Sequence, residues 1–488
     1  MNVKTEQLAE MLGSGNVLDD PSLLESYSKD QSFVMPIKPW GIVKPRNLED
    51  VQQIIGWANK SHTSLVPVSS GSPHFRGDTV PGTPGAIMVD MQEMKRIIRI
   101  NRRNRMAMIE PGVTYSQLQP ELAKEGLTLP NPLLPRTNKS VIASLLEREP
   151  RLIPRLQWSI LDPLRCIQVV WGDGVKMTTG DAESNGTLEE EWQKGYTQLI
   201  PSGPQQTDFY KLVSAAQGTM GIVTWASIRC EVLPDIHKLF FAPSPKLENL
   251  IDPLYRILRF RFGDELFILN KWSLASILGD GPDQIKSLAE KLSSWVILIG
   301  IAGRYVLTKE KVDYLQKDIS DIVQQFGLQL QPSIPGTDGD EVLNKILYPS
   351  REPYWRLGYK GGCQDIFFLS TLEKSPEFVK TMYAIAEQLD YPTSEIGIYI
   401  QPIHQGASCH IDFALPYNPN NYWEVYRMKE LYIKASEALL KQGAYFSRPY
   451  GKWAEMAFNR DVQTTTVLRK IKNIFDPNNI MNTGKLCF

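Results

Sequence analysis

The sequence predicts an α+β fold of two or more domains. Its 488 residues exceed what one ordinary core organises, and 42% hydrophobic with 22% charged residues is a globular composition. From about residue 235, strand-sized runs alternate with amphipathic helices, which predicts an open sheet covered by helices. Two Ser/Gly-rich segments, 65–79 and 216–224, each join a strand run. Small residues let a backbone approach a ligand closely, so the pair indicates a binding site.

Before residue 235, helical and strand-sized patterns alternate. Residues 48–59 are apolar at 48, 51, 54, 55 and 58, the spacing of one helix face. Gly172-Asp173-Gly174 predicts a hairpin turn between two short apolar runs. The predicted helices are 3–12, 20–28, 48–59 and 115–127, and the predicted strands are 64–68, 87–90, 97–100, 106–109, 166–170 and 175–179. Residues 181–205 are polar and predict a long surface loop.

Three later segments predict helices. Residues 309–326 are amphipathic and lie between strand-like runs. Residues 375–389 open with Ser375 and Pro376, a cap followed by proline at the first helical position. Residues 467–475 form the last predicted helix, which the Asp476-Pro477 pair ends.

Composition excludes several functional classes. The formal net charge is −1 and no long basic block occurs, which argues against nucleic-acid binding. No apolar run reaches the length of a membrane span, and the first residues lack the apolar core of a signal peptide, so we expect a soluble cytoplasmic protein. The five cysteines are scattered without a CxxC pair, so we expect no disulfide framework, structural zinc or iron–sulfur cluster in this chain.

Five segments in order carry a family resemblance. They are Val43–Val51, Ser69–Gly77, Ile109–Tyr115, Gln217–Thr224 and Phe475–Lys485. Together they resemble the vanillyl-alcohol oxidase/4-cresol dehydrogenase superfamily, the PCMH-type FAD-binding oxidoreductases, over nearly the whole chain. The resemblance implies a PCMH-type FAD-binding domain at 1–235, an α+β cap domain with a large antiparallel sheet at 236–445, and a C-terminal segment, 446–488, that returns to the FAD domain.

The resemblance also implies which residues hold FAD. They come from the two Ser/Gly-rich segments, the turn after residue 109, the start of a helix near 140 and the C-terminal signature. These residues are Ser69, Ser70, Gly71, Ser72, Pro73, His74, Gly77, Pro111, Gly112, Ser140, Gly218, Thr219, Gly221, Ile222, Val223 and Lys485.

Two departures from the family pattern affect the flavin site. Ser72 or Pro73 stands where many relatives have a histidine bonded to the flavin, and His74 is one or two residues away. We therefore expect non-covalent FAD. The segment 143–158 lacks the family's glycines and has Gln157 where one branch has an acidic residue. Arginines 148, 151 and 155 are expected to pair with glutamates 147 and 149 as a surface network, or alternatively to line an entrance for anions.

The expected catalytic residues are Arg448, His404, His410 and Tyr445. Arg448 takes the place of the arginine that steadies phenolate in the vanillyl-alcohol oxidase branch, and an always-charged guanidinium suits an oxyanion. Strand alternation predicts that positions 404, 406, 408 and 410 share one face, with the two histidines as bases or as ordinary sheet histidines.

Two further segments bear on the substrate. Where the hydroxy-acid branch has Glu-His, this chain has Arg448-Pro449, so we expect no metal site. The aromatic-rich segment Tyr354, Trp355, Arg356 and Tyr359 is a candidate wall for a flat substrate, with Trp355 expected in the cap core.

The resulting hypothesis is an FAD-dependent dehydrogenase that removes hydride from a small alcohol or phenolic substrate. The alternative is a D-2-hydroxy acid dehydrogenase subunit, of the glycolate/lactate type, that passes electrons to an iron–sulfur partner. A third hypothesis, a flavoprotein subunit with an electron-carrying duty in a larger complex, rests on the altered segment 143–158. We expect a homo-oligomer or hetero-complex in each case.

Overall fold

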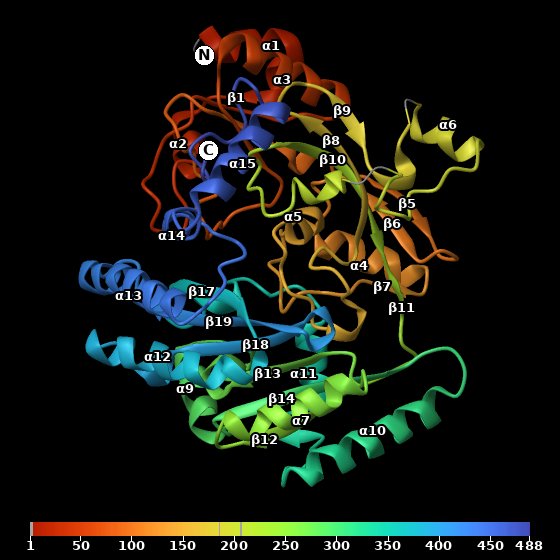
Figure 1. Ribbon diagram of the computed structural model, residues 1–488, viewed down its shortest axis with the longest axis vertical. Helices are drawn as coiled ribbons and strands as arrows, with labels where there is room; N and C mark the ends of the chain where they lie inside the picture. The colour runs from red at the N-terminus through yellow and green to blue at the C-terminus, as the bar shows by residue number, and fades with distance from the viewer. Residues whose placement is uncertain (1–2, 185, 205–206) are drawn as a thin grey trace.

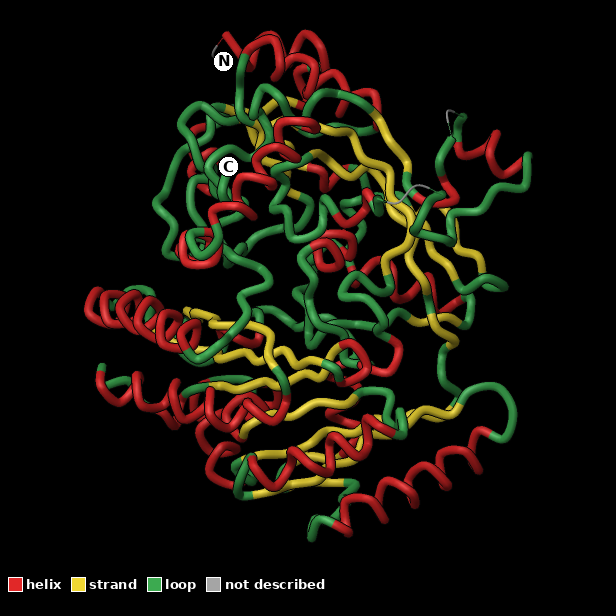
Figure 2. Tube along the Cα trace, viewed as in Figure 1, coloured by secondary structure: helices red, strands yellow, loops and turns green. Residues whose placement is uncertain are grey.

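The computed structural model describes residues 3–184, 186–204 and 207–488. The chain from its start to β11, together with the last two helices, forms the upper part of Figure 1, and the segment from β12 to α13 forms the lower part. Many connecting loops gather between the two parts (Figure 2). The fold is α+β, as the sequence predicts.

The first sheet places one Ser/Gly-rich segment at the end of a buried strand. Its order is β1-β2-β4-β3, with β2, β4 and β3 parallel. The strands are β1 (Val17–Leu18), β2 (Gly41–Val43), β3 (Leu65–Val68) and β4 (Ile87–Asp90). Helices α1 (Val3–Leu12) and α3 (Leu48–Ser61) pack against it through a shared core. The predicted helix 48–59 is confirmed, and Asn47 caps it by accepting from the Asp50 amide.

The second sheet places the other Ser/Gly-rich segment at the start of its central strand. It is antiparallel in the order β5-β6-β10-β8-β9. The strands are β5 (Ile97–Asn101), β6 (Met106–Ile109), β8 (Leu164–Trp171), β9 (Lys176–Thr178) and β10 (Gly221–Arg229). Helices α4 (Tyr115–Lys124) and α5 (Val141–Leu146) pack on it. The predicted hairpin between β8 and β9 is confirmed.

The prediction of an uninterrupted loop over 181–205 is wrong in one stretch. Helix α6 (Leu188–Gln193) forms there because Thr187 and Glu190 make a reciprocal capping box. A mostly polar helix of this kind is set by its cap rather than by an apolar face, so periodicity did not reveal it.

The lower part is built on one antiparallel sheet, β12-β14-β13-β18-β19-β17. The strands are β12 (Ile236–Ser244), β13 (Leu266–Asn270), β14 (Trp295–Gly303), β17 (Gly362–Ser370), β18 (Gly397–Ile403) and β19 (Ser408–Tyr417). The helices are α7 (Glu248–Arg259), α8 (Lys271–Leu278), α9 (Pro282–Lys291), α10 (Thr308–Gln325), α11 (Gly339–Ile346), α12 (Ser375–Gln388) and α13 (Tyr422–Lys441). The predicted helices 309–326 and 375–389 are confirmed within a residue.

Alternation along the strands gives the sheet two faces. One face packs with α7, α10, α12 and α13 around residues such as Ile411 and Phe413. The opposite face packs with α8, α9 and α11 and also meets Leu133, Leu134 and Leu152 of the upper part. The second face is therefore the one that meets the upper part of the molecule.

The C-terminal segment ties the two Ser/Gly-rich segments together. Helices α14 (Lys452–Phe458) and α15 (Val462–Phe475) lead to it, and α15 starts five residues before the predicted 467 because Asp461 caps it. Asn482 donates Nδ2 to the carbonyls of Asp78 and Gln217, at 2.9 and 2.6 Å. Lys485 donates Nζ to the Gly77 carbonyl at 2.7 Å.

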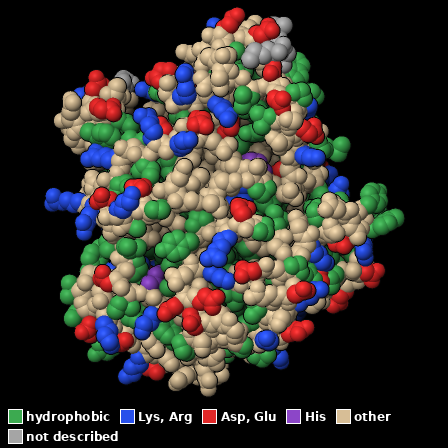
Figure 3. Space-filling model, turned by 180° about the vertical axis from the view of Figure 1, so that it is seen from behind, with side chains coloured by type: hydrophobic (Ala, Val, Ile, Leu, Met, Phe, Trp, Pro, Cys, Tyr) green, Lys and Arg blue, Asp and Glu red, His purple; other side chains and the backbone are tan. Residues whose placement is uncertain are grey.

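The surface carries both signs of charge. On the face shown in Figure 3, Lys and Arg side chains are interspersed with Asp and Glu. Within the described part of the chain, no helix is long and apolar enough to cross a membrane.

Candidate active site

A cavity lined from both parts lies where the two parts meet. One end, the loop end, is lined from residues 67–79, 139–149 and 213–223. The other, the sheet end, is lined from one face of the large sheet and from the segment before α14. Its residues are Tyr354, Arg356, Asp365, Phe367, Tyr399, His410, Asp412, Arg448 and Tyr450.

Hydrogen bonds with neighbouring segments hold the loop that follows β3. The Gly71 amide donates to the Asn138 carbonyl at 3.0 Å, and Arg136 donates Nη1 to the Gly71 carbonyl at 2.8 Å. The Gly77 amide donates to Asp30 at 2.6 Å. Gly77 has φ +75°, and a Cβ there would lie 2.3 Å from Val34, so only glycine fits this turn.

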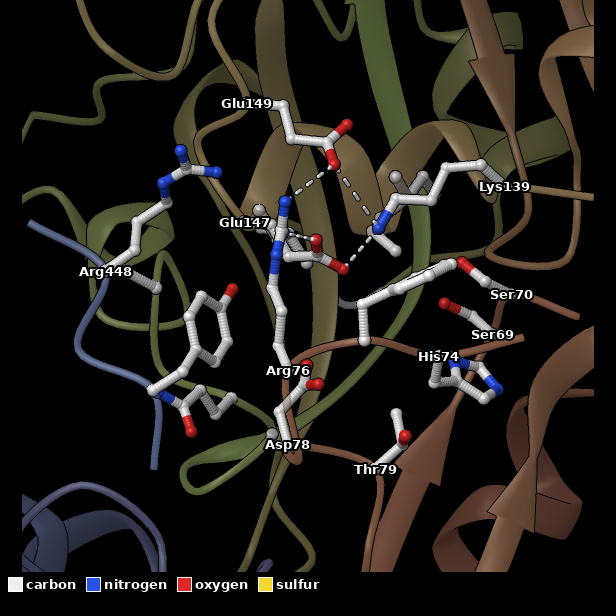
Figure 4. Close-up of a pocket in the computed structure, with 18 of the residues that line it drawn as sticks. Ser69, Ser70, His74, Arg76, Asp78, Thr79, Lys139, Glu147, Glu149 and Arg448 are labelled. Atoms are coloured by element: carbon white, nitrogen blue, oxygen red, sulfur yellow. Dashed lines mark hydrogen bonds and ion pairs between the residues drawn. The ribbon is translucent and has the colours of Figure 1, made fainter. Parts of the chain in front are cut away.

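The loop end contains a buried network of alternating charges (Figure 4). Arg76 lies 2.5 Å from Glu147 and 3.5 Å from Glu149, and Lys139 lies 2.6 Å from Glu147 and 3.7 Å from Glu149. Burial opposes ionisation of Glu149, but Lys139 and Arg76 outweigh it and lower its pKa. Burial and the neighbouring Glu147 raise the pKa of Asp78 to about 6. Glu147 and Glu149 thus each form ion pairs with two cations.

Arg448, at the sheet end, is buried without any hydrogen bond or ion pair among the described residues. Its side chain is 4% exposed, its Nη1 atom has no partner, and its guanidinium lies 4.0 Å from the centre of the Phe367 ring. Figure 4 shows it apart from the dashed network of the loop end. Burial and Arg76 lower the pKa of Arg448 to about 10, so it remains charged at neutral pH. A buried cation of this kind favours an anionic ligand.

Beside Arg448, one arginine bridges two aspartates. Arg356 donates to Asp365 at 2.5 Å and to Asp412 at 2.7 Å. The Asp412 carboxylate lies 3.9 Å from Nε2 of His410, beyond hydrogen-bond distance. Burial, reinforced by Arg448, lowers the pKa of His410 to about 4, so its imidazole is neutral near pH 7.

Ten predicted site residues line this cavity. They are Ser69, Ser70, His74, Pro111, Gly218, Gly221, Ile222, Val223, His410 and Arg448. Burial lowers the pKa of His74 to about 3, with Arg136 and Lys139 adding to the effect.

The other predicted cofactor residues stand behind the lining. They are Gly71, Ser72, Pro73, Gly77, Gly112, Ser140, Thr219 and Lys485. Ser140, for example, donates to the Pro111 carbonyl at 2.5 Å and caps α5. Lys485 likewise acts from outside the lining, where its Nζ donates to the Gly77 carbonyl.

Two predicted catalytic residues lie outside the cavity lining. The alternation expected over 404–410 is wrong, because a turn with left-handed φ at His404 and Gln405 separates β18 from β19. His404 instead contacts Ser408, with 3.0 Å between Nδ1 and Oγ. Tyr445 pairs through its backbone with Leu369 and its side chain is 62% exposed.

The predicted network around segment 143–158 is also wrong. Arg148 donates to Ser214, Arg151 to Tyr115 and Arg155 to Asp264, at 2.6, 2.7 and 2.7 Å. The two glutamates face the cavity, not the surface. Gln157 is buried outside the lining, and its Oε1 has no partner.

Several lining residues were missed by sequence reasoning. They are Arg76, Asp78, Thr79, Lys139, Asp365, Phe367 and Asp412. Asp412 was accessible from the sequence, because alternation places it on the same strand face as His410. Tyr399 pairs with Asp412 across β18 and β19, and it lines the cavity together with Asp412. The partners of Arg76 are 71 and 73 residues away, beyond any local pattern.

Two known families match parts of this chain, and known proteins are similar to it over nearly its whole length. Residues 39–146 match the FAD binding domain, and residues 449–486 match the C-terminal domain of FAD linked oxidases. A D-2-hydroxyglutarate dehydrogenase of Stutzerimonas stutzeri (strain A1501) is 25% identical, covering 99% of this chain and 98% of that protein. The 4-cresol dehydrogenase [hydroxylating] flavoprotein subunit of Pseudomonas putida is 22% identical, covering 99% and 95%. The chain is therefore an FAD-dependent oxidoreductase that carries the FAD binding domain and the C-terminal domain of FAD linked oxidases.

The fold of this flavoenzyme is shared with solved structures. Substrate-bound p-cresol methylhydroxylase aligns with TM-score 0.83 at 17% identity, covering 100% of this chain and 96% of that one. The 4-ethylphenol oxidase from Gulosibacter chungangensis aligns with TM-score 0.82 at 18% identity, covering 99% and 96%.

The residues of the loop end fit FAD, the cofactor of this flavoenzyme. Hydroxyls and small residues line it, and Gly218 has φ +70° with room for no Cβ, since one would lie 2.5 Å from Pro67. The backbone can therefore approach a dinucleotide closely there. Ser69, Ser70 and Thr79 supply hydroxyl donors, and Lys139 supplies a buried cation.

Proposed function

We propose that this FAD-dependent dehydrogenase oxidises a small aromatic alcohol or phenolic compound that carries one anionic oxygen group. Arg448 carries the proposal, because among the described residues it is the cation at the sheet end that forms no hydrogen bond or ion pair. A guanidinium binds a carboxylate through two parallel hydrogen bonds, and it can donate to the single oxygen of a phenolate. Binding such an anion would satisfy a group that is otherwise buried and unpaired.

The walls of the sheet end suit a flat substrate. Phe367, Tyr399, Tyr450 and Tyr354 line it, and Tyr354 lies 5.5 Å from Phe75 between ring centres. Aromatic side chains favour planar ligands through stacked or edge contacts. Trp355, the residue expected in the cap core, packs at the edge of the core cluster behind this wall.

The cofactor and the chain's residues have separate roles in the proposed reaction. FAD, when bound, accepts the hydride. Arg448 orients the substrate, and the closed aromatic walls limit water at the reacting carbon. In this proposal 1–235 and 446–488 form the FAD domain and 236–445 the cap.

The alternative substrate is a D-2-hydroxy acid. Two observations support it: Arg448 would hold a carboxylate as readily as a phenolate, and a D-2-hydroxyglutarate dehydrogenase is similar to this chain over nearly its whole length. A 2-hydroxy dicarboxylate would need a second free cation, whereas the other arginine at the sheet end, Arg356, already faces two aspartates. We therefore favour the monoanionic aromatic substrate. The alternative would pass electrons to a separate iron–sulfur protein.

Anaerobic bleaching of the bound flavin tests the proposal. Phenolic alcohols, aromatic carboxylate alcohols and D-2-hydroxy acids would be added in turn to the yellow holoenzyme. We expect bleaching by the aromatic compounds in wild type and strong loss in Arg448→Met, with Arg427→Gln, an exposed arginine of α13, as control. Bleaching by D-2-hydroxy acids alone would move the assignment to the alternative.

Three further expectations complete the proposal. FAD should leave with the supernatant after acid precipitation, because we propose that the flavin is non-covalent, with Ser72 or Pro73 at the position of the linking histidine. Light scattering during gel filtration should give an oligomer or a hetero-complex. Fractionation of the source cells should recover the enzyme in the cytoplasm.

A further inference from the structure

Four charged or titratable residues meet at one point of the sheet end. They are Asp365 of β17, His410 and Asp412 of β19, and Arg356 of the short helix η6 (Trp355–Leu357). The Asp365–Arg356–Asp412 clamp is defined by contacts of 2.5 and 2.7 Å. Asp412 is 6% exposed and His410 is 2% exposed.

The strand geometry fixes which way the histidine faces. Ile411 and Phe413 enter the core on one side of β19, so His410 and Asp412 face the other side, toward the cavity. The His410 ring lies between aromatic neighbours, 6.0 Å from Phe367 and 5.8 Å from Tyr399 between ring centres. Among the described residues, no side chain hydrogen-bonds the imidazole. Neither ring nitrogen therefore has a side-chain partner at hydrogen-bond distance, and a buried histidine of this kind at a cavity wall is available to a ligand.

We propose that the Asp365–Arg356–Asp412 clamp positions His410 to accept a proton from a hydroxyl group on the substrate carbon that loses hydride. Arg356 is the positioning residue, because it holds the Asp412 carboxylate beside Nε2 of His410. The inference rests on the proposed function, since Arg448 must hold the substrate's anion in the same space. It narrows the substrate class to alcohols.

The step balances without another reactant. The O–H bond breaks and its proton goes to the imidazole, while the electron pair left on oxygen forms the C=O bond. The C–H bond breaks and its electron pair leaves with hydrogen as hydride, with the flavin as the oxidant. The product is an aldehyde or ketone. A substrate with only a methyl group at that carbon has no hydroxyl proton for His410 to take.

The charges that face His410 keep it able to accept a proton. Asp412 lies on its own strand, Arg448 and Arg356 approach from other segments, and Tyr399 stands on the neighbouring strand. Burial and the two arginines disfavour the imidazolium, and Asp412 favours it. The ring is therefore neutral in the resting enzyme, and the aspartate can stabilise the cation once it forms.

Histidine-selective NMR of the FAD-loaded holoenzyme tests this arrangement. The chain has five histidines, and His410→Gln assigns the signal. The double variant Arg356→Gln with Asp365→Asn removes one positive and one negative charge. It therefore avoids leaving two buried aspartates without their arginine, which could prevent folding. We expect the His410 pKa to rise by at least one unit in this double variant and to fall in Asp412→Asn.

Opposite shifts support the clamp, because loss of local structure alone would move both variants toward the ordinary value near 6.5. Shifts of equal sign, or no shift, would overturn the inference. Arg259→Gln, an exposed arginine of α7, is the control and should leave the signal unchanged.

A kinetic comparison separates this inference from the proposed function. His410→Gln should slow flavin bleaching by an alcohol by about 10²- to 10⁴-fold, with little change in its dissociation constant. Undiminished bleaching would overturn the role of His410 while leaving the anion site intact. If Arg448→Met binds the alcohol normally, the proposed function fails, whereas the NMR result still decides whether the clamp acts on His410.

Discussion

At the loop end of the cavity, Arg76 and Lys139 each form ion pairs with two carboxylates. At the sheet end, Arg448 forms no ion pair with the described residues. Both ends are buried, so the contrast does not come from solvent. Charges that neutralise one another inside the protein hold backbone segments in place. A buried charge without a partner raises the free energy of the empty site, and a ligand that pairs with it recovers that cost.

The same contrast separates the two arginines of the sheet end. Arg356 is bound by Asp365 and Asp412, and Arg448 by an aromatic ring alone. We infer that Arg356 belongs to the framework and Arg448 to recognition. Substitutions at the two sites should therefore have effects of different kinds.

The largest effect should come from Arg448→Met. Loss of the guanidinium removes the two hydrogen bonds to the substrate anion, so kcat/KM should fall by about 10³-fold or more, roughly 4 kcal/mol. The free energy of unfolding of the apoprotein should not fall, because a buried unpaired charge is removed. Steady-state kinetics and urea unfolding measure the two effects.

Arg448→Lys sharpens this result. A lysine keeps the charge but not the planar pair of donors, so activity should lie between wild type and Arg448→Met. Equal activity in all three proteins would show that the unpaired charge is not a recognition group.

Arg356→Met should have the opposite effect on stability. It leaves two aspartates unpaired at the sheet end, and breaking a buried pair in this way costs about 3 kcal/mol or more of unfolding free energy. Urea unfolding of the apoprotein measures it. A smaller loss than that caused by Arg448→Met would reverse the assignment of framework and recognition.

The sequence predicted the fold better than the charges of the site. Helix 48–61 and the β8–β9 hairpin follow from apolar spacing and turn residues within one short window. The turn at His404 was missed because two non-glycine residues adopt left-handed backbone, which no residue preference marks.

The cavity residues divide in the same way. Ser69, Ser70 and Gly218 were predicted to bind FAD because small residues beside a strand form a local signal. The Arg356–Asp412 pair joins residues 56 positions apart, and only the strand order β18-β19-β17 brings them together. Glu147 was given surface partners because its pairing with Arg76 depends on how the loop after β3 folds back, and its second partner, Lys139, was not considered.

The two buried histidines of the cavity should make the protein less stable in acid, whereas the raised pKa of Asp78, about 6, acts in the opposite direction. Burial lowers the pKa of His410 to about 4 and of His74 to about 3, so between pH 6.5 and these values the unfolded chain binds more protons than the native one. Stability is therefore fully present above pH 6.5 and falls as the pH falls. At pH 5 each histidine costs about 2 kcal/mol, taken at about 1.4 kcal/mol per pH unit, with less for the more exposed His74.

Urea unfolding at pH 5 and pH 7 measures this effect. His410→Gln should lose less stability than wild type between the two values, and the two proteins should show the same pH dependence above pH 7. An equal loss of unfolding free energy between pH 7 and pH 5 in both proteins would mean that His410 is not held neutral by its surroundings.

The smallest effect should come from Lys139→Met at the loop end. Arg76 still faces both glutamates in this variant, so the network loses one cation but leaves neither carboxylate unpaired. FAD should bind about tenfold more weakly, about 1.4 kcal/mol, because one buried charged donor near the cofactor is lost. Fluorescence titration of the apoprotein with FAD measures the affinity.

The KM of the FAD-saturated enzyme should stay within about threefold of wild type, because Arg448 is untouched. A large rise in KM with unchanged FAD affinity would show that Lys139 acts on the substrate. It would contradict the proposal that paired charges hold the structure and the unpaired charge binds the substrate.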